Sequence, residues 1–94
     1  MLQHGLFQCS EKWVWEGTSS LAYQFLEKGY DVWLGNNRGN IYSRYSTKYS
    51  ASADPKQFYD YSFFEMGKYD LPAMISGILG QVPGHSSLSY IGFS

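Results

Sequence analysis

The segment Gly92-Phe93-Ser94 contains the residues best suited to nucleophilic chemistry. It follows a short β-prone run that includes Leu88, Tyr90 and Ile91. Gly-x-Ser is the first half of a G-x-S-x-G motif, in which a strand delivers a serine to a tight turn. A glycine two residues before the serine avoids a Cβ that would crowd the turn. Such a short pattern occurs by chance in many proteins, so it needs support from elsewhere in the chain.

A second feature, His4-Gly5-Leu6, lies near the other end of the chain. It follows Met1–Gln3, which looks like the frayed end of a strand and is too short to be predicted as one. A backbone N–H just after such a glycine can stabilise the negative charge that develops on an oxygen during ester hydrolysis. The alternative is an ordinary turn with a surface histidine, which is the usual meaning of an isolated His-Gly pair.

Arg38 lies in a turn cluster, Gly35–Asn40, that follows a predicted strand. Ligands bind at the carboxyl edge of open parallel sheets, so Arg38 could hold an anion there. We favour the alternative that Arg38 ties this loop to Glu65 or Asp70 through charge-assisted hydrogen bonds. His85 is a poor catalytic candidate, because it lies in the linker before the last strand, away from that edge.

The first predicted helix follows a loop-like stretch over residues 8–18, with Trp13 and Trp15 as anchors. A serine or threonine at 18–20 can cap its N-terminus, and Gly29 can end it. Its apolar residues have helical spacing: Leu21, Ala22, Phe25 and Leu26. The β-branched and aromatic residues over 30–34 then predict a strand.

The second half of the chain begins with a polar stretch, residues 41–57, that predicts a long surface loop. Ser62 and Glu65 fit the capping box S-x-x-E of a helix. Asp70 and Pro72 predict that the helix restarts there, with Asp70 as its cap. The apolar face of that helix consists of Leu71, Ile75, Ile78 and Leu79. With the final β-prone run, the order of elements predicts an α/β fold with parallel strands.

Composition limits the possible functions. The chain has 94 residues, a net charge of −1 and 16% charged residues, so it lacks the basic field of a nucleic-acid-binding protein. Aromatic residues make up 19%, which is more typical of core and pocket walls than of a base-stacking surface. Cys9 is the single cysteine, which excludes an intrachain disulfide or a CxxC metal site. We therefore expect no metal, no cofactor and no nucleic-acid partner.

Four segments taken in order, HGLF, YDVWLGNNRGN, FFEMGKYDLPA and YIGFS, resemble the acid lipase family. This family includes gastric and lysosomal acid lipases and fungal sterol esterases. The resemblance covers essentially all 94 residues, and the spelling of YIGFS and GNNRGN is more similar to the fungal sterol esterase and triglyceride lipase branch. It implies a partial α/β-hydrolase domain over 1–94, an N-terminal fragment that extends from the oxyanion turn to the nucleophile serine.

The resemblance also implies residue roles. Ser94 matches the nucleophile, and Leu6 matches the residue whose backbone N–H is one oxyanion donor, with His4 and Gly5 shaping that turn. It further implies that the strand leading to this turn lies between the other two. Because the central strand is reduced to three residues here, we expect its neighbours to leave backbone groups unpaired.

The acid and the histidine of the implied triad lie beyond this chain, and neither Asp70 nor His85 matches them. We therefore expect the 94-residue chain alone to be inactive. The aromatic residues Phe7 and Phe93, and also Trp13 and Trp15, could contact the acyl chain of a substrate, although core packing explains each equally well.

Two functional hypotheses follow. The first is a fragment of a serine ester hydrolase that acts on lipid esters, either sterol esters or acylglycerols, by acyl transfer to Ser94. The second is a non-enzymatic product that binds lipid or a partner chain through exposed aromatic surface. A lipid droplet or membrane surface is a possible partner of either. The location stays open among lipid droplet, endomembrane and secretion.

Overall fold

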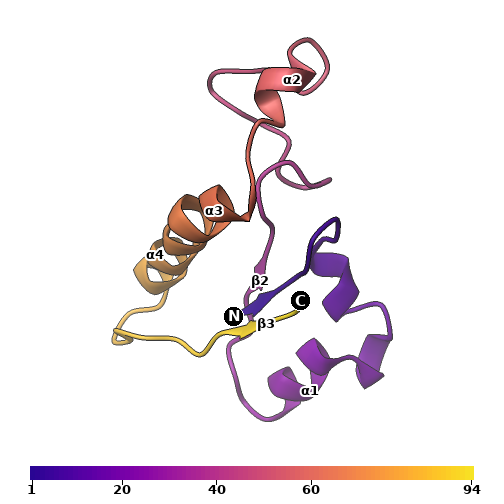
Figure 1. Ribbon diagram of the computed structural model, residues 1–94. Coiled ribbons are helices and arrows are strands. Elements are labelled where there is room, and N and C mark those ends of the chain that lie inside the picture. Colours follow the sequence, from indigo (N-terminus) through magenta and orange to yellow (C-terminus); the bar gives the residue numbers. More distant parts are fainter.

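The computed structural model describes all 94 residues and has a small parallel sheet between helices (Figure 1). Its three strands are β1 (Leu2–Gln3), β2 (Leu34–Gly35) and β3 (Ile91–Gly92). The strand order is β2-β1-β3, and both pairings are parallel. The predicted α/β class and the implied central position of the first strand are therefore confirmed.

The strands are shorter than the sequence predicts, and Leu2–Gln3 is a strand although it was judged too short to be one. The predicted strands over 30–34 and 88–93 form regular pairs over only two residues each, because β1 offers only two residues for pairing. The expectation that the neighbours remain unpaired is wrong where they face β1. The N–H of Leu2 donates to the Trp33 carbonyl at 2.8 Å, and the N–H of Phe93 donates to the Gln3 carbonyl at 3.1 Å.

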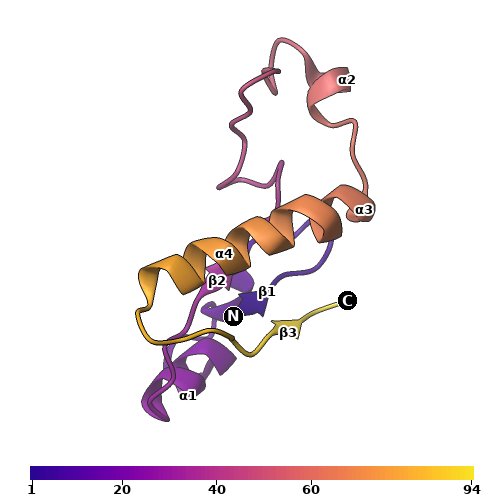
Figure 2. The same cartoon turned by 90° about the vertical axis from the view of Figure 1, so that its left-hand side faces the viewer.

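Helices lie on both sides of this sheet, with α4 above the strands and α1 below them in the second view (Figure 2). The α-helices are α1 (Leu21–Glu27), α2 (Pro55–Phe58), α3 (Phe63–Glu65) and α4 (Leu71–Gln81). Two 3-10 turns, η1 (Ser10–Trp13) and η2 (Gly17–Ser19), and one π-helical turn, η3 (Met66–Asp70), complete the set. The stretch predicted as a long loop is mostly irregular and projects from the sheet with α2, whose first three residues lie within it.

The core lies between the sheet and α1. Leu2, Trp13 and Ala22 are buried together, and Phe25, Val32 and Leu34 pack against them. The anchor prediction is therefore confirmed for Trp13 but wrong for Trp15, whose side chain is 76% exposed. Ten of the 94 residues are buried, so the apolar contribution to stability is small and single contacts weigh heavily.

The predicted caps of α1 and α3 are present. The N–H of Tyr23 donates to the Ser20 side chain at 3.4 Å, at the start of α1. At α3, the N–H of Ser62 donates to the Glu65 carboxylate at 2.7 Å, and the Ser62 side chain caps in return. These hydrogen bonds, led by the Ser62 N–H, lower the pKa of the Glu65 carboxyl.

The predicted helix start is confirmed at Leu71, where α4 begins with Pro72 in its first turn, but the prediction that Asp70 caps it is wrong. Helix α3, turn η3 and helix α4 follow one another without a break, and Asp70 makes no capping hydrogen bond. Pro72 has no N–H to donate within a helix, and the π turn directly before it shifts the hydrogen-bond register at that point. The predicted inner face of α4 is confirmed, with Ile78 buried and Ile75 and Leu79 partly buried.

Candidate active site

The carboxyl ends of β1 and β3 bring the two chemically interesting segments together. A Cβ on Gly5 would lie 2.9 Å from the Phe93 carbonyl oxygen and 3.0 Å from the Phe93 ring. A methyl group would therefore overlap backbone, and only glycine permits this approach. The turn after β1 and the serine after β3 thus lie at one edge of the sheet.

Ser94 is exposed and has a φ of +67°. A positive φ is uncommon for a residue other than glycine, and such strained backbone clusters at functional sites. It is also what a serine on a sharp turn after a strand requires. The expected crowding at Gly92 is real but involves the ring of Tyr90, which lies 3.0 Å from a Cβ there, and not the turn itself.

Phe93 contacts a lysine as well as the glycine turn. The Nζ of Lys12, in η1, lies 3.6 Å from the centroid of the Phe93 ring and 5.4 Å from that of Trp13. A cation over an aromatic face is attracted by the ring quadrupole. Lys12 therefore lies between Phe93 and the buried Trp13, a contact that sequence reasoning missed because it depends on tertiary structure.

The turn after His4 leaves a backbone donor free. The Gly5 carbonyl accepts from the Gln8 N–H at 3.2 Å, and the Gly5 N–H donates to the Gln8 side chain at 3.0 Å. Within this turn Phe7 has a φ of +61° and a side chain that is 98% exposed. The N–H of Leu6 donates to no acceptor in the chain. The turn is thus strained and presents one unused N–H.

His4 is buried, so the alternative of a surface histidine is wrong. Its Nε2 accepts from the Asn37 backbone N–H at 3.1 Å and lies 3.1 Å from the Asn40 side-chain amide. Its Nδ1 lies 2.8 Å from the Gly5 carbonyl oxygen. Sequence reasoning missed Asn37 and Asn40. The available signal was their position in a turn cluster at the carboxyl edge, beside the strand that ends at His4.

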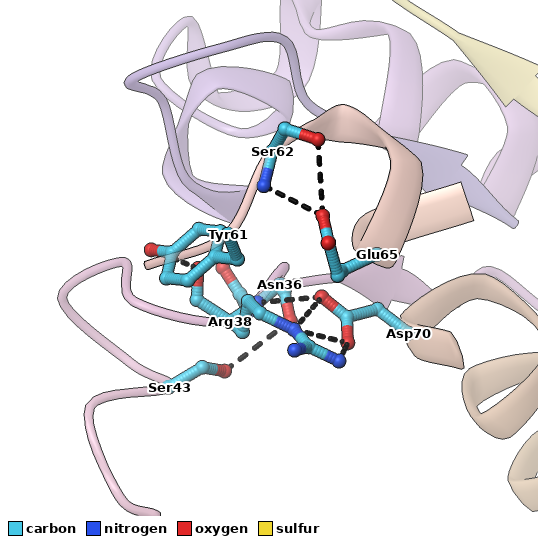
Figure 3. Close-up of polar contacts among 7 residues, drawn as sticks. All are labelled: Asn36, Arg38, Ser43, Tyr61, Ser62, Glu65 and Asp70. Carbon is cyan, nitrogen blue, oxygen red and sulfur yellow. Dashed lines mark hydrogen bonds and ion pairs between the residues drawn. The ribbon is translucent and has the colours of Figure 1, made fainter. Parts of the chain in front are cut away.

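Arg38 is tied to an acid, as predicted (Figure 3). Its Nη2 lies 2.8 Å from Oδ1 of Asp70, its Nε donates to the same carboxylate at 2.9 Å, and its backbone N–H donates at 3.1 Å. Asp70 is thus the partner, whereas Glu65 caps α3. The hydrogen bonds to Asp70 raise the pKa of Arg38 above its ordinary value. The hydroxyl of Tyr61 donates to the Arg38 carbonyl at 3.0 Å, and burial raises its pKa.

The two residues considered for a triad lie elsewhere. Asp70 is occupied by Arg38, and His85 is exposed and lines an apolar groove of about 440 Å³ together with Met1, Trp33 and Leu88. Because those residues precede the strands, the groove lies at the amino edge of the sheet, opposite Ser94. No three His, Cys, Asp or Glu side chains are grouped to hold a metal ion. None of the helices has the length and apolar character needed to cross a membrane.

Fold and site define a parallel α/β protein that carries a serine and a glycine turn at the carboxyl edge of its sheet. The sequence comparison is more specific. Gastric triacylglycerol lipase of Rattus norvegicus is 46% identical over 94 residues, and lysosomal acid lipase/cholesteryl ester hydrolase of Homo sapiens is 45% identical over 94 residues. A probable lipase of Schizosaccharomyces pombe is 44% identical over 93 residues. The chain is a relative of the gastric and lysosomal acid lipases, which confirms the resemblance.

These matches cover 99%, 99% and 97% of the chain. In the other direction, the chain spans only 23%, 23% and 19% of those proteins, about a fifth of the curated relatives it matches. That share is consistent with the interpretation as a fragment. The identities do not favour the fungal branch over the animal one. No protein-family model matches the chain.

Proposed function

We propose that this chain supplies the nucleophile and one oxyanion donor of a serine ester hydrolase with an α/β-hydrolase fold. The substrates are lipid esters, either acylglycerols or sterol esters, by analogy with relatives named as a triacylglycerol lipase and a cholesteryl ester hydrolase. The contact between Gly5 and the Phe93 carbonyl carries the proposal. It brings the unused N–H of Leu6 and the strained Ser94 to the same edge of the sheet.

In the proposed reaction Oγ of Ser94 attacks the ester carbonyl carbon, and the bond from that carbon to the alcohol oxygen breaks. The serine proton leaves on the alcohol, and water then hydrolyses the acyl-serine to release the carboxylic acid. The N–H of Leu6 stabilises the oxyanion in both steps. A general base is needed to activate the serine, and neither histidine of this chain makes a hydrogen bond with Ser94, so the chain by itself is expected not to hydrolyse esters.

A chimaera tests this proposal. In it, the 94 residues replace the matched segment of the rat gastric lipase, which supplies the rest of that enzyme. A fluorophosphonate probe should label the chimaera at Ser94, and Ser94→Ala should abolish labelling and hydrolysis of a triacylglycerol. Ser86→Ala, at an exposed serine in the same segment, is the matched control and should change neither. Labelling that survives Ser94→Ala would refute the role of Ser94.

A second candidate function rests on the exposed aromatic surface. The side chains of Phe7, Phe63 and Trp15 are 98%, 84% and 76% exposed. Such side chains suit the surface of a lipid droplet or membrane, or a partner chain. Under this proposal the 94-residue chain co-sediments with phosphatidylcholine vesicles without hydrolysing any ester. A chain that stays monomeric and remains in the supernatant when the vesicles sediment would exclude this function.

A further inference from the structure

The hydrogen bonds of His4 fix the position of its proton. The Asn37 backbone N–H can only donate, and it points at Nε2 of His4 at 3.1 Å. Nε2 must therefore accept and carry no proton. The Gly5 carbonyl can only accept, and it lies 2.8 Å from Nδ1. Both contacts require the same form, a neutral imidazole with its proton on Nδ1.

That proton determines how the next peptide group is oriented. The Gly5 carbonyl accepts from Nδ1–H of His4 and from the Gln8 N–H at 3.2 Å, so its direction is fixed from two sides. The Gly5 carbonyl and the Leu6 N–H belong to one planar peptide group, and all peptide bonds of the chain are trans. In a trans peptide these two groups point in opposite directions. Holding the carbonyl inward therefore turns the Leu6 N–H outward, where it donates to nothing in the chain.

The loop between β2 and the polar stretch holds the imidazole in turn. The Asn40 amide donates one hydrogen toward Nε2 of His4 at 3.1 Å and the other to Oδ1 of Asn36 at 2.9 Å. The same Oδ1 accepts from the Ser10 N–H at 2.9 Å. The Arg38 ion pair anchors this loop to the end of η3. Every hydrogen of the Asn40 amide is thus used, and the ring has little freedom to turn.

We propose that His4 is a positioning residue that keeps the Gly5–Leu6 peptide in the orientation needed for an oxyanion donor. The inference rests on the proposed function, since it assigns the Leu6 N–H a role in ester hydrolysis. His4 itself touches neither the substrate nor Ser94. It acts through one hydrogen bond to the Gly5 carbonyl, and the Asn37–Asn40 segment acts through His4.

Two substitutions in the chimaera separate the two ends of the imidazole. In His4→Asn the amide nitrogen can take the place of Nδ1 and still donate to the Gly5 carbonyl. In His4→Gln the longer amide can take the place of Nε2 and keep the contacts to the loop, but it loses the carbonyl. Loss of one oxyanion donor lowers kcat by about 10²-fold to 10³-fold. We expect His4→Gln to show about a 10²-fold fall in kcat with little change in KM. The kcat of His4→Asn should be at least about tenfold higher than that of His4→Gln.

Equal values of kcat in the two variants would overturn the proposal, because a purely structural histidine would not distinguish them. Fluorophosphonate labelling of the unsubstituted chimaera at Ser94 is the separate check on the proposed function, so the two failures are distinguishable.

The proton position is measurable without any activity. Side-chain 15N NMR of the 94-residue chain should show His4 protonated at Nδ1 and unprotonated at Nε2. The exposed His85, the only other histidine, is the internal control and should show both neutral forms in exchange. A proton on Nε2 of His4, or identical spectra for the two histidines, would overturn the proposal.

Discussion

Replacing Asp70 with asparagine removes a charge at the end of η3. That charge holds the loop at 36–40, which contacts His4. The Asp70 carboxylate receives three Arg38 donors at 2.8 to 3.1 Å. A hydrogen bond to a charged group contributes about 1.5–3 kcal/mol, whereas an exposed ion pair contributes only about 0.2–1 kcal/mol. The Asp70 side chain is 13% exposed, but the Arg38 side chain is 37% exposed, so solvent screens part of the attraction.

We therefore expect Asp70→Asn to lower the free energy of unfolding by about 1.5 kcal/mol, the lower limit of the first range, because solvent screens part of the pair. For a small domain with a total of about 5 kcal/mol, this is a large fraction. Urea unfolding followed by far-UV circular dichroism measures the change. Glu27→Gln is the matched control, because Glu27 is exposed on α1 and makes no ion pair or side-chain hydrogen bond.

A double-mutant cycle sharpens this test. Arg38→Gln and Asp70→Asn remove the same interaction, so the double variant should be little less stable than either single variant. The reasoning would be refuted if Asp70→Asn destabilised the chain no more than Glu27→Gln, or if the two effects at Arg38 and Asp70 were simply additive.

Four further substitutions test other local contacts of the chain. Gly5→Ala places a methyl group 2.9 Å from a facing backbone carbonyl and should destabilise the chain by about 1–3 kcal/mol, with weaker Ser94 labelling in the chimaera. Gly39→Ala introduces a Cβ that overlaps the Tyr61 hydroxyl at a φ of +81° and should lower the free energy of unfolding measured with urea. Gly77→Ala, in α4 with open space around it, should raise that free energy by about 0.5–1 kcal/mol. The pKa of Glu65 is lowered in the folded chain, so its stabilisation is present above the ordinary value of 4.5 and is lost as the pH falls below it; Glu65→Gln should remove that acid-side loss from a pH series of urea midpoints.

Local features of the fold were predictable because short-range chemistry determines them. The serine cap of α1 and the Ser62–Glu65 box follow from unpaired N–H groups that every helix start must satisfy. The pairing of Arg38 with an acid was also predicted, since a guanidinium beside a sheet edge needs a charged partner. In each case the partners are few and the sequence names them.

Features that depend on long-range geometry were not predictable. The sequence does not show that His4 is buried, because that depends on the loop at 36–40 lying beside the end of β1. It does not distinguish Trp13 from Trp15, because only the direction of η1 decides which indole reaches Leu2. The continuity of α3 with α4 was also missed, because a π turn has no sequence signal comparable to a cap.

Because the sheet is short, hydrogen bonds in the turn after β1 contribute more than strand pairing to fixing the geometry of the candidate site. In a long parallel sheet, strand pairing would fix the turn after the central strand. Here β1 pairs over two residues on each side. The turn directly beyond it is held by the hydrogen bonds of the His4 ring, from the Asn37 N–H and to the Gly5 carbonyl, and by the one from the Gln8 N–H to that carbonyl. A substitution such as Asp70→Asn should therefore disturb the Leu6 N–H before it disturbs substrate binding. In the chimaera this disturbance appears as a loss of kcat that exceeds any change in KM.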